Sequence, residues 1–181
     1  MRYSYLLLTL VLLIASCAKK ADEKSTEATQ NVEKNEATIT ASHSIPRYTF
    51  EEFSPLLHKD DDKTYVVNFW ATWCAPCVKE LPYFEELYSK YKEQGVELIL
   101  VSLDFPSKIE SQLVPFVKKH DLKGTVIFLD DPDQNSWIPK VNKEWSGAIP
   151  ATLIYNRDKR DFFERSFTYE ELETELKQYL N

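Results

Sequence analysis

The sequence predicts an α/β fold in which a central mixed sheet is flanked by helices on both faces. Segments typical of buried strands alternate with segments of helical periodicity, and a hairpin and a last helix close the chain. The chain has 181 residues, of which 43% are hydrophobic and 13% aromatic. That composition suffices for one folded domain, expected over residues 46–181, preceded by an N-terminal tail.

Two helix N-termini are predicted at the beginning of this domain. Thr49 and Glu52 have the spacing of a capping box, in which each residue satisfies a free backbone N–H near the other. Ser54-Pro55 places a proline at a first helical position, where its missing N–H costs nothing.

The first central strand is predicted over residues 66–70, which are mostly β-branched and aromatic. From Val78 onward, apolar residues recur every three or four positions, which predicts a helix that runs to Lys92. Pro82 is expected to kink this helix, and Gly95 is expected to end it.

Further strands are predicted over residues 96–103 and 125–129, because both segments are short and apolar. Residues 109–120 between them have an amphipathic pattern with Leu113 on the inner face. Pro115 argues against one unbroken helix there.

Residues 130–145 are expected to be irregular or partly helical, broken by Pro132 and Pro139. A hairpin is predicted from residues 151–155 to residues 162–167, and a capped helix from Thr168 to Leu180 is predicted to end the chain.

The chemistry of the chain is predicted at Cys74 and Cys77, which lie between the first central strand and the helix after it. A free thiol has a pKa of about 8.5, and a helix N-terminus in a Cys-x-x-Cys turn can lower it to about 7 or below. Cys74 is expected to be the more exposed sulfur and Cys77 the shielded one. Such a pair attacks a disulfide with its first sulfur and resolves the mixed disulfide with its second.

The N-terminus is predicted to be a targeting segment. Arg2 precedes an apolar run over residues 6–15, which is too short for a membrane span but fits a signal peptide. The run ends at Cys17 and resembles the bacterial lipobox, so residues 1–16 are predicted to be a lipoprotein signal peptide and Cys17 the lipidated residue. A signal peptide cut nearby, with Cys17 left as a free thiol, is the alternative. Residues 17–45 lack aromatic residues and are predicted to be a flexible tether.

Composition argues against several other functions. The net charge of −7 disfavours a nucleic-acid partner, and the three glycines are too scattered to form a phosphate-binding loop. A zinc site would need ligands besides the two cysteines, and His43, His58 and His120 form no paired motif with them. No metal or cofactor is therefore predicted.

Several motifs resemble the TlpA/ResA branch of the thioredoxin superfamily. They are residues 68–77 (NFWATWCAPC), residues 79–82 (KELP) and residues 147–152 (GAIPAT), and the resemblance extends over residues 45–181. It implies a thioredoxin-like fold and a membrane-tethered protein disulfide reductase in the bacterial cell envelope, outside the cytoplasm and facing the periplasm. Disulfides persist in that compartment, so a reduced dithiol there needs a supply of electrons.

The resemblance also implies the partners of the protein. Its clients would be disulfide-containing proteins, such as the haem-binding cysteines of apocytochrome c or metal-delivery proteins. Its electron donor would be a membrane thiol transporter, and its contact with the membrane would be the lipid anchor.

By the same resemblance, Cys74 and Cys77 are catalytic, and the substrate is bound by Trp73, Ala75, Pro76, Ile149 and Pro150. Pro150 would be a cis-proline facing the active site, with the Ile149 backbone offered to an incoming peptide. The alternative is an ordinary turn proline.

Glu80 is the third catalytic candidate, three residues after Cys77 on the same helical face. The resemblance implies that it tunes the dithiol and accepts or relays a proton, whereas an unrelated surface glutamate would only be solvated. Asn68 departs from thioredoxin, which has a buried aspartate at this position, and an amide cannot accept a proton in that way.

Two other functions are alternatives to disulfide reduction. A peroxiredoxin-like peroxidase would need a Pro-x-x-x-Thr/Ser-x-x-Cys pattern, but Val67 and Ala71 occupy the proline and threonine positions. A copper carrier of the Sco type uses a Cys-x-x-x-Cys pair, which is one residue longer than the spacing here.

Overall fold

A computed structural model describes residues 44–180 of the chain. The predicted signal peptide, the predicted lipidated Cys17 and nearly all of the predicted tether lie outside these residues. Within the described part, the strands of the single sheet are β1 (Arg47–Tyr48), β2 (Thr64–Trp70), β3 (Val96–Ser102), β4 (Thr125–Leu129), β5 (Ala151–Tyr155) and β6 (Arg160–Phe163). The helices are α1 (Phe50–Phe53), α2 (Ala75–Tyr91), α3 (Val114–His120), α4 (Gln134–Val141) and α5 (Tyr169–Leu176).

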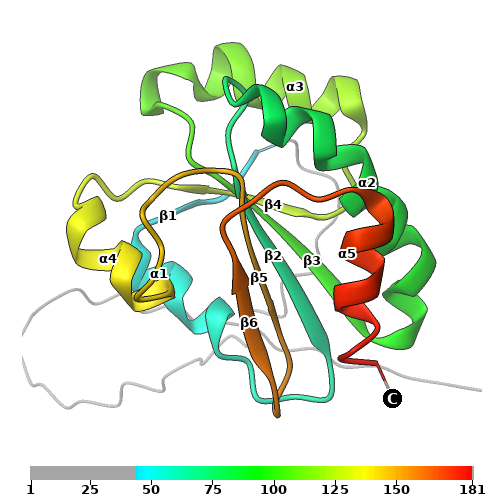
Figure 1. Ribbon diagram of the computed structural model, residues 1–181. Coiled ribbons are helices and arrows are strands. Elements are labelled where there is room, and N and C mark those ends of the chain that lie inside the picture. The colour runs from blue at the N-terminus through cyan, green and yellow to red at the C-terminus, as the bar shows by residue number, and fades with distance from the viewer. Residues whose placement is uncertain (1–43, 181) are drawn as a thin grey trace, which may run out of the picture. The chain divides into compact units, whose positions relative to one another are not determined.

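The sheet has the strand order β1-β4-β3-β2-β5-β6. Strands β1 to β4 pair in parallel, whereas β5 pairs antiparallel with both β2 and β6. Figure 1 shows this twisted sheet between its covering helices. The predicted mixed sheet with helices on both faces is confirmed.

Alternation along β2 divides the core between the two faces of the sheet. Val66 and Trp70 pack with α2, α3 and α5 on one face, and Val67 and Phe69 pack with α1 and α4 on the other. Every residue of β2 is buried, as its apolar sequence predicts for a central strand. The end of β2 is therefore a rigid base for the cysteines that follow it.

Most helix caps and helix ends predicted from local sequence patterns are confirmed. Thr49 and Thr168 each form the predicted capping box, and Gly95 has the left-handed φ of 84° with which the helical segment after α2 ends. Helix α2 continues through Pro82. The segment with Pro115 begins as a π-helical turn over Ile109–Leu113 before α3, so it is not one regular helix.

One strand was not predicted, and three predicted element limits were wrong. Strand β1 was not predicted because it is only two residues long. Pro139 was expected to break any helix in its segment, but α4 continues through it and ends at Val141. Strand β6 ends at Phe163 rather than at residue 167, because the chain then leaves the sheet to bind the active-site region. Helix α5 ends at Leu176 rather than at residue 180.

Among residues 44–180, no helix is both long and apolar enough to span a membrane.

Candidate active site

Cys74 and Cys77 form a disulfide bond at the N-terminus of α2, with their Cα atoms 5.3 Å apart. Cys74 is the N-cap residue, and the backbone N–H of Cys77 donates to its sulfur at 3.3 Å. The first N–H groups of a helix have no partner within the helix, so they can stabilise negative charge on a sulfur at this position. The predicted strand-to-helix placement of the pair is confirmed.

The two sulfurs differ in access. Cys77 is fully buried, whereas Cys74 retains 5% of its surface. The sulfur of Cys74 lies 3.8 Å from the carbonyl oxygen of Ile149. Of the two cysteines, Cys74 is thus the less buried, and its sulfur lies next to the Ile149 backbone.

The peptide bond between Ile149 and Pro150 is cis, as the family resemblance implies. Ala151 directly after it pairs with Phe69 of β2, which places Pro150 at the end of the sheet where the cysteines emerge. Pro150 is buried and Ile149 is partly exposed, so the Ile149 backbone can be reached from outside.

Glu80 is buried, with 1% of its surface exposed. Its Oε2 accepts the backbone N–H of Phe167 at 2.8 Å, and its Oε1 accepts the amide of Asn68 at 3.3 Å. Burial raises the pKa of Glu80 to about 7, although these two hydrogen bonds and the charge of Arg165 oppose the shift. A carboxyl group that titrates near neutral pH suits proton transfer, and the alternative of a merely solvated glutamate is wrong.

A cavity of about 270 Å³ lies beside this carboxyl group, lined by Glu80, Pro76, Lys79 and Phe167 among other residues. It leaves room for water next to Glu80. Asn68 is fully buried on β2, and its amide also donates to Thr152 Oγ1 at 3.1 Å. Asn68 thus orients the Glu80 carboxyl group from the sheet side.

The rim of the site is apolar. Trp73 is 54% exposed and Phe105 61%, and their rings stack with centroids 6.0 Å apart. Ala75 and Pro76 are also exposed. Within residues 44–180, Trp73 and Phe105 are the exposed large hydrophobic side chains, and Trp73 directly precedes Cys74.

A buried hydrogen-bond cluster holds these two aromatic residues. Asp104 accepts the backbone N–H of Thr72 at 3.1 Å, the Thr72 hydroxyl at 2.5 Å and the Ser102 hydroxyl at 2.8 Å. Thr72 precedes Trp73 and Asp104 precedes Phe105, so the bonds between Thr72 and Asp104 fix the aromatic pair.

Sequence reasoning missed Phe105, Asp104 and Thr72. The sequence does contain a signal for Asp104, because this residue follows the end of a predicted strand that pairs with the strand before Cys74. The carboxyl ends of parallel strands meet at one edge of a sheet. Across residues 44–180, no group of three or more His, Cys, Asp or Glu side chains is arranged to hold a metal ion.

The comparisons with known proteins agree with this geometry. The model of the AhpC/TSA family matches residues 45–160. A curated relative, "Thiol-disulfide oxidoreductase ResA" of Oceanobacillus iheyensis, is 36% identical over 104 residues, which are 54% of this chain and 54% of that protein. The chain thus spans about half the length of this relative. A second ResA, from Geobacillus kaustophilus, is 28% identical over 143 residues, 76% of this chain and 77% of the relative.

A solved structure supports the fold. The thiol:disulfide interchange protein of the thioredoxin family from Chlorobium tepidum superposes with a TM-score of 0.55 at 19% identity. The superposition covers 71% of this chain and 85% of that one. The predicted thioredoxin-like fold and the resemblance to ResA are confirmed.

Proposed function

The chain belongs to the AhpC/TSA family, and we propose that it is a protein thiol-disulfide oxidoreductase that works mainly as a disulfide reductase. One observation carries the proposal. Cys74 and Cys77 are joined at the N-terminus of α2, with Cys74 the less buried of the two and its sulfur beside the Ile149 backbone, and with Cys77 fully buried. This is the arrangement that two-step thiol–disulfide exchange requires.

In the first step, the Cys74 thiolate attacks one sulfur of the client's disulfide. The client's S–S bond breaks, Cys74 forms a mixed disulfide, and the departing client sulfur leaves as a thiolate that takes up a proton. The N–H of Cys77 and the helix N-terminus favour the thiolate of Cys74 as the attacking form.

In the second step, Cys77 attacks the sulfur of Cys74. Cys77 loses its proton to the Glu80 carboxylate, which lies one helical turn further along α2. The mixed disulfide breaks, the second client sulfur leaves as a thiolate, and Cys74 and Cys77 are oxidised to the disulfide. Two electrons have then passed to the client, and an external dithiol must return the pair to its reduced state.

Client binding is assigned to Trp73, Ala75, Pro76, Ile149 and Pro150. The Ile149 backbone pairs with an extended client segment, and the exposed Trp73 ring covers the residues next to the client's cysteine. Exposure of Trp73, Ala75 and Pro76 beside Cys74 supports this assignment.

The cellular setting is also part of the proposal. Cys17 anchors the protein to a membrane of the bacterial envelope, outside the cytoplasm, and a membrane thiol transporter supplies its electrons. The clients are disulfide-containing proteins, for example apocytochrome c or metal-delivery proteins. The lipobox-like sequence before Cys17 and the similarity to proteins named ResA support this setting.

Reduction of insulin disulfides by the pre-reduced protein tests the activity. The wild type should precipitate insulin, and Cys74→Ser should not. Cys77→Ser should accumulate a covalent adduct through Cys74, because its mixed disulfide cannot be resolved. An absence of adducts would count against the mechanism.

Peroxide consumption and copper titration separate the two alternatives from the proposal. Peroxide consumption faster than insulin reduction would favour a peroxidase, and tight copper binding by the reduced pair would favour a copper carrier.

A further inference from the structure

The four residues after β6 connect two parts of the candidate active site. Residues 164–167, called the strap here, leave the sheet after Phe163 and end at Thr168, the N-cap of α5. Glu164 at the start of the strap binds the loop before Ile149. Phe167 at its end binds Glu80.

The exposed Glu164 side chain accepts hydrogen bonds from the loop of Ser146, Gly147 and Ala148. It accepts the backbone N–H groups of Ser146 and Ala148, each at 3.1 Å, and the hydroxyl of Ser146. Gly147 between them has a φ of 93°, a conformation that glycine adopts without strain. The N–H groups of two residues in one tight loop thus point at a single carboxylate, which is the kind of partner that converging backbone N–H groups favour.

Both backbone polar groups of Ala148 are hydrogen-bonded to other residues. Its N–H is bound by Glu164, and its carbonyl oxygen accepts the indole N–H of the buried Trp145 at 2.8 Å. Ile149, the next residue, has its carbonyl oxygen 3.8 Å from the sulfur of Cys74. The orientation of the Ile149 backbone therefore depends on the contacts of Ala148.

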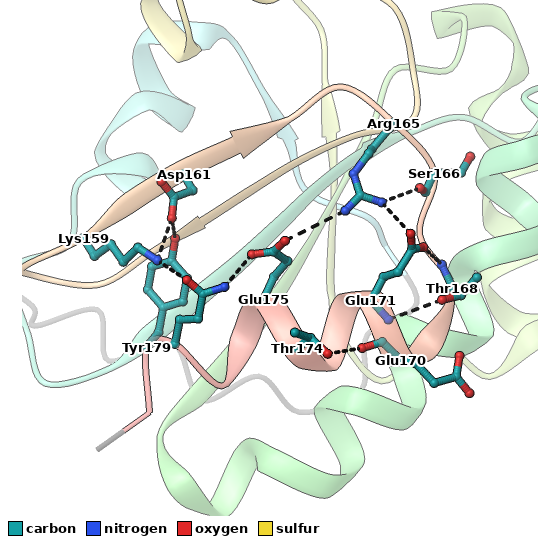
Figure 2. A network of polar contacts seen from close by, with 11 residues as sticks. Lys159, Asp161, Arg165, Ser166, Thr168, Glu170, Glu171, Thr174, Glu175 and Tyr179 are labelled. Carbon is teal, nitrogen blue, oxygen red and sulfur yellow. Dashed lines mark hydrogen bonds and ion pairs between the residues drawn. The ribbon is translucent and has the colours of Figure 1, made fainter.

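The second residue of the strap, Arg165, binds α5, as Figure 2 shows. Arg165 forms ion pairs with Glu171 at 3.3 Å and Glu175 at 3.9 Å, and its guanidinium group lies 4.1 Å from the centre of the Phe167 ring. The strap is thus attached at both ends, and Glu164 is not free to leave the loop without breaking several contacts.

We propose that Glu164 is a positioning residue for client binding. Its carboxylate orders residues 146–148, so that the Ile149 backbone is already oriented to pair with an extended peptide segment that carries the client's disulfide. The inference rests on the proposed function. Because Glu164 acts through the loop and not on the sulfurs, it should affect peptide disulfides and leave disulfides without a peptide backbone unaffected.

The test compares two substrates with the full chain. One is a peptide with a single disulfide, and the other is bis(2-hydroxyethyl) disulfide, which has no backbone to pair with Ile149. Glu164→Ala removes the acceptor, and Glu164→Gln keeps one acceptor oxygen. Glu144→Gln is the matched control, because Glu144 is in the same loop region and its side chain makes no hydrogen bond or ion pair with the described residues.

For Glu164→Ala, the KM for the peptide should rise about fivefold or more, the effect of losing net hydrogen bonds that order the loop. The kcat for the peptide and the rate with bis(2-hydroxyethyl) disulfide should stay within about twofold of the wild type, and Glu164→Gln should lie between. Glu144→Gln should match the wild type with both substrates.

Hydrogen exchange of the amides in residues 146–149 provides a readout independent of activity. Exchange should be faster in Glu164→Ala than in Glu144→Gln. Unchanged KM and unchanged exchange in Glu164→Ala would overturn the inference, and so would an equal loss with both substrates, which would assign Glu164 to the sulfur chemistry or to general stability. A wild type that reduces neither substrate would refute the proposed function itself, a result distinct from these.

Discussion

The backbone N–H of Phe167 donates to Glu80 Oε2 at 2.8 Å, although 87 residues separate the two in the chain. This bond joins the helix that carries the cysteines to the segment before α5. It partly compensates the burial of a carboxyl group whose pKa is nevertheless raised to about 7, mainly by that burial. The Glu80 carboxyl group is therefore expected to change its charge near neutral pH.

The stability of the oxidised protein should depend on pH through Glu80. Its pKa is about 7 in the folded state against the usual 4.5, so the folded state binds the proton more tightly than the unfolded state. The contribution of Glu80 to the free energy of unfolding is fully present below pH 4.5 and is lost as the pH rises to about 7. The free energy of unfolding should fall by up to about 3 kcal/mol across this window.

Urea denaturation of the oxidised wild type and of Glu80→Gln at several pH values measures this effect. The difference in the free energy of unfolding between the two proteins should change between pH 4.5 and 7 and be constant above it. Over this range the variant should become more stable relative to the wild type. Parallel curves for the two proteins would contradict the raised pKa.

Glu80→Gln should also slow the resolving step. The amide cannot accept the proton of Cys77, so turnover should fall by roughly tenfold or more with peptide and small disulfides alike. Stopped-flow measurement of mixed-disulfide decay isolates this step. Decay at the wild-type rate would show that water, rather than Glu80, takes the proton.

Asp104→Asn should destabilise the domain by about 1–3 kcal/mol, because an amide cannot accept all the hydrogen bonds that Thr72 and Ser102 now donate to the carboxylate. The midpoint of urea denaturation reports the loss. Asp133→Asn, an exposed substitution whose side chain caps no helix, is the control and should change stability little. An equal effect of both substitutions would refute the role of the buried cluster.

Phe105→Ser should weaken the binding of clients that have a large apolar residue beside their cysteine. The exposed ring stacks on Trp73 next to Cys74, so its removal takes away apolar contact area. The KM for a peptide disulfide with leucine beside the cysteine should rise about fivefold, which corresponds to roughly 1 kcal/mol, less than the value of about 1.5–3 kcal/mol for a fully buried side chain.

A peptide with serine at the same position serves as the control substrate, and Lys108→Ser serves as the control variant on the same segment. Phe105→Ser should not raise the KM for the serine peptide, and Lys108→Ser should not raise the KM for the leucine peptide. If Phe105→Ser affected both peptides equally, the aromatic pair would not select its client by apolar contact.

Local patterns in the sequence were enough to find the centre of the site. The apolar run over residues 66–70 and the helical periodicity after Cys77 place the two cysteines at a strand-to-helix junction, because both signals depend only on neighbouring residues. The capping boxes at Thr49 and Thr168 were found for the same reason. Boundaries failed where distant contacts compete with local preference, as in β6, where Glu164 and Phe167 bind other parts of the chain instead of extending the strand.

The dithiol, its spacing and the class of fold around it can be predicted from local patterns in the chain. Long-range packing, in contrast, buries Glu80, brings Phe167 and Asn68 to it, and places Phe105 against Trp73. It also brings Glu164 to the loop before Ile149. These features escape local patterns because the pKa of a carboxyl group and the orientation of a backbone are fixed by the groups packed around them. In this fold those groups come from segments far apart in the chain, which no local pattern in the sequence relates.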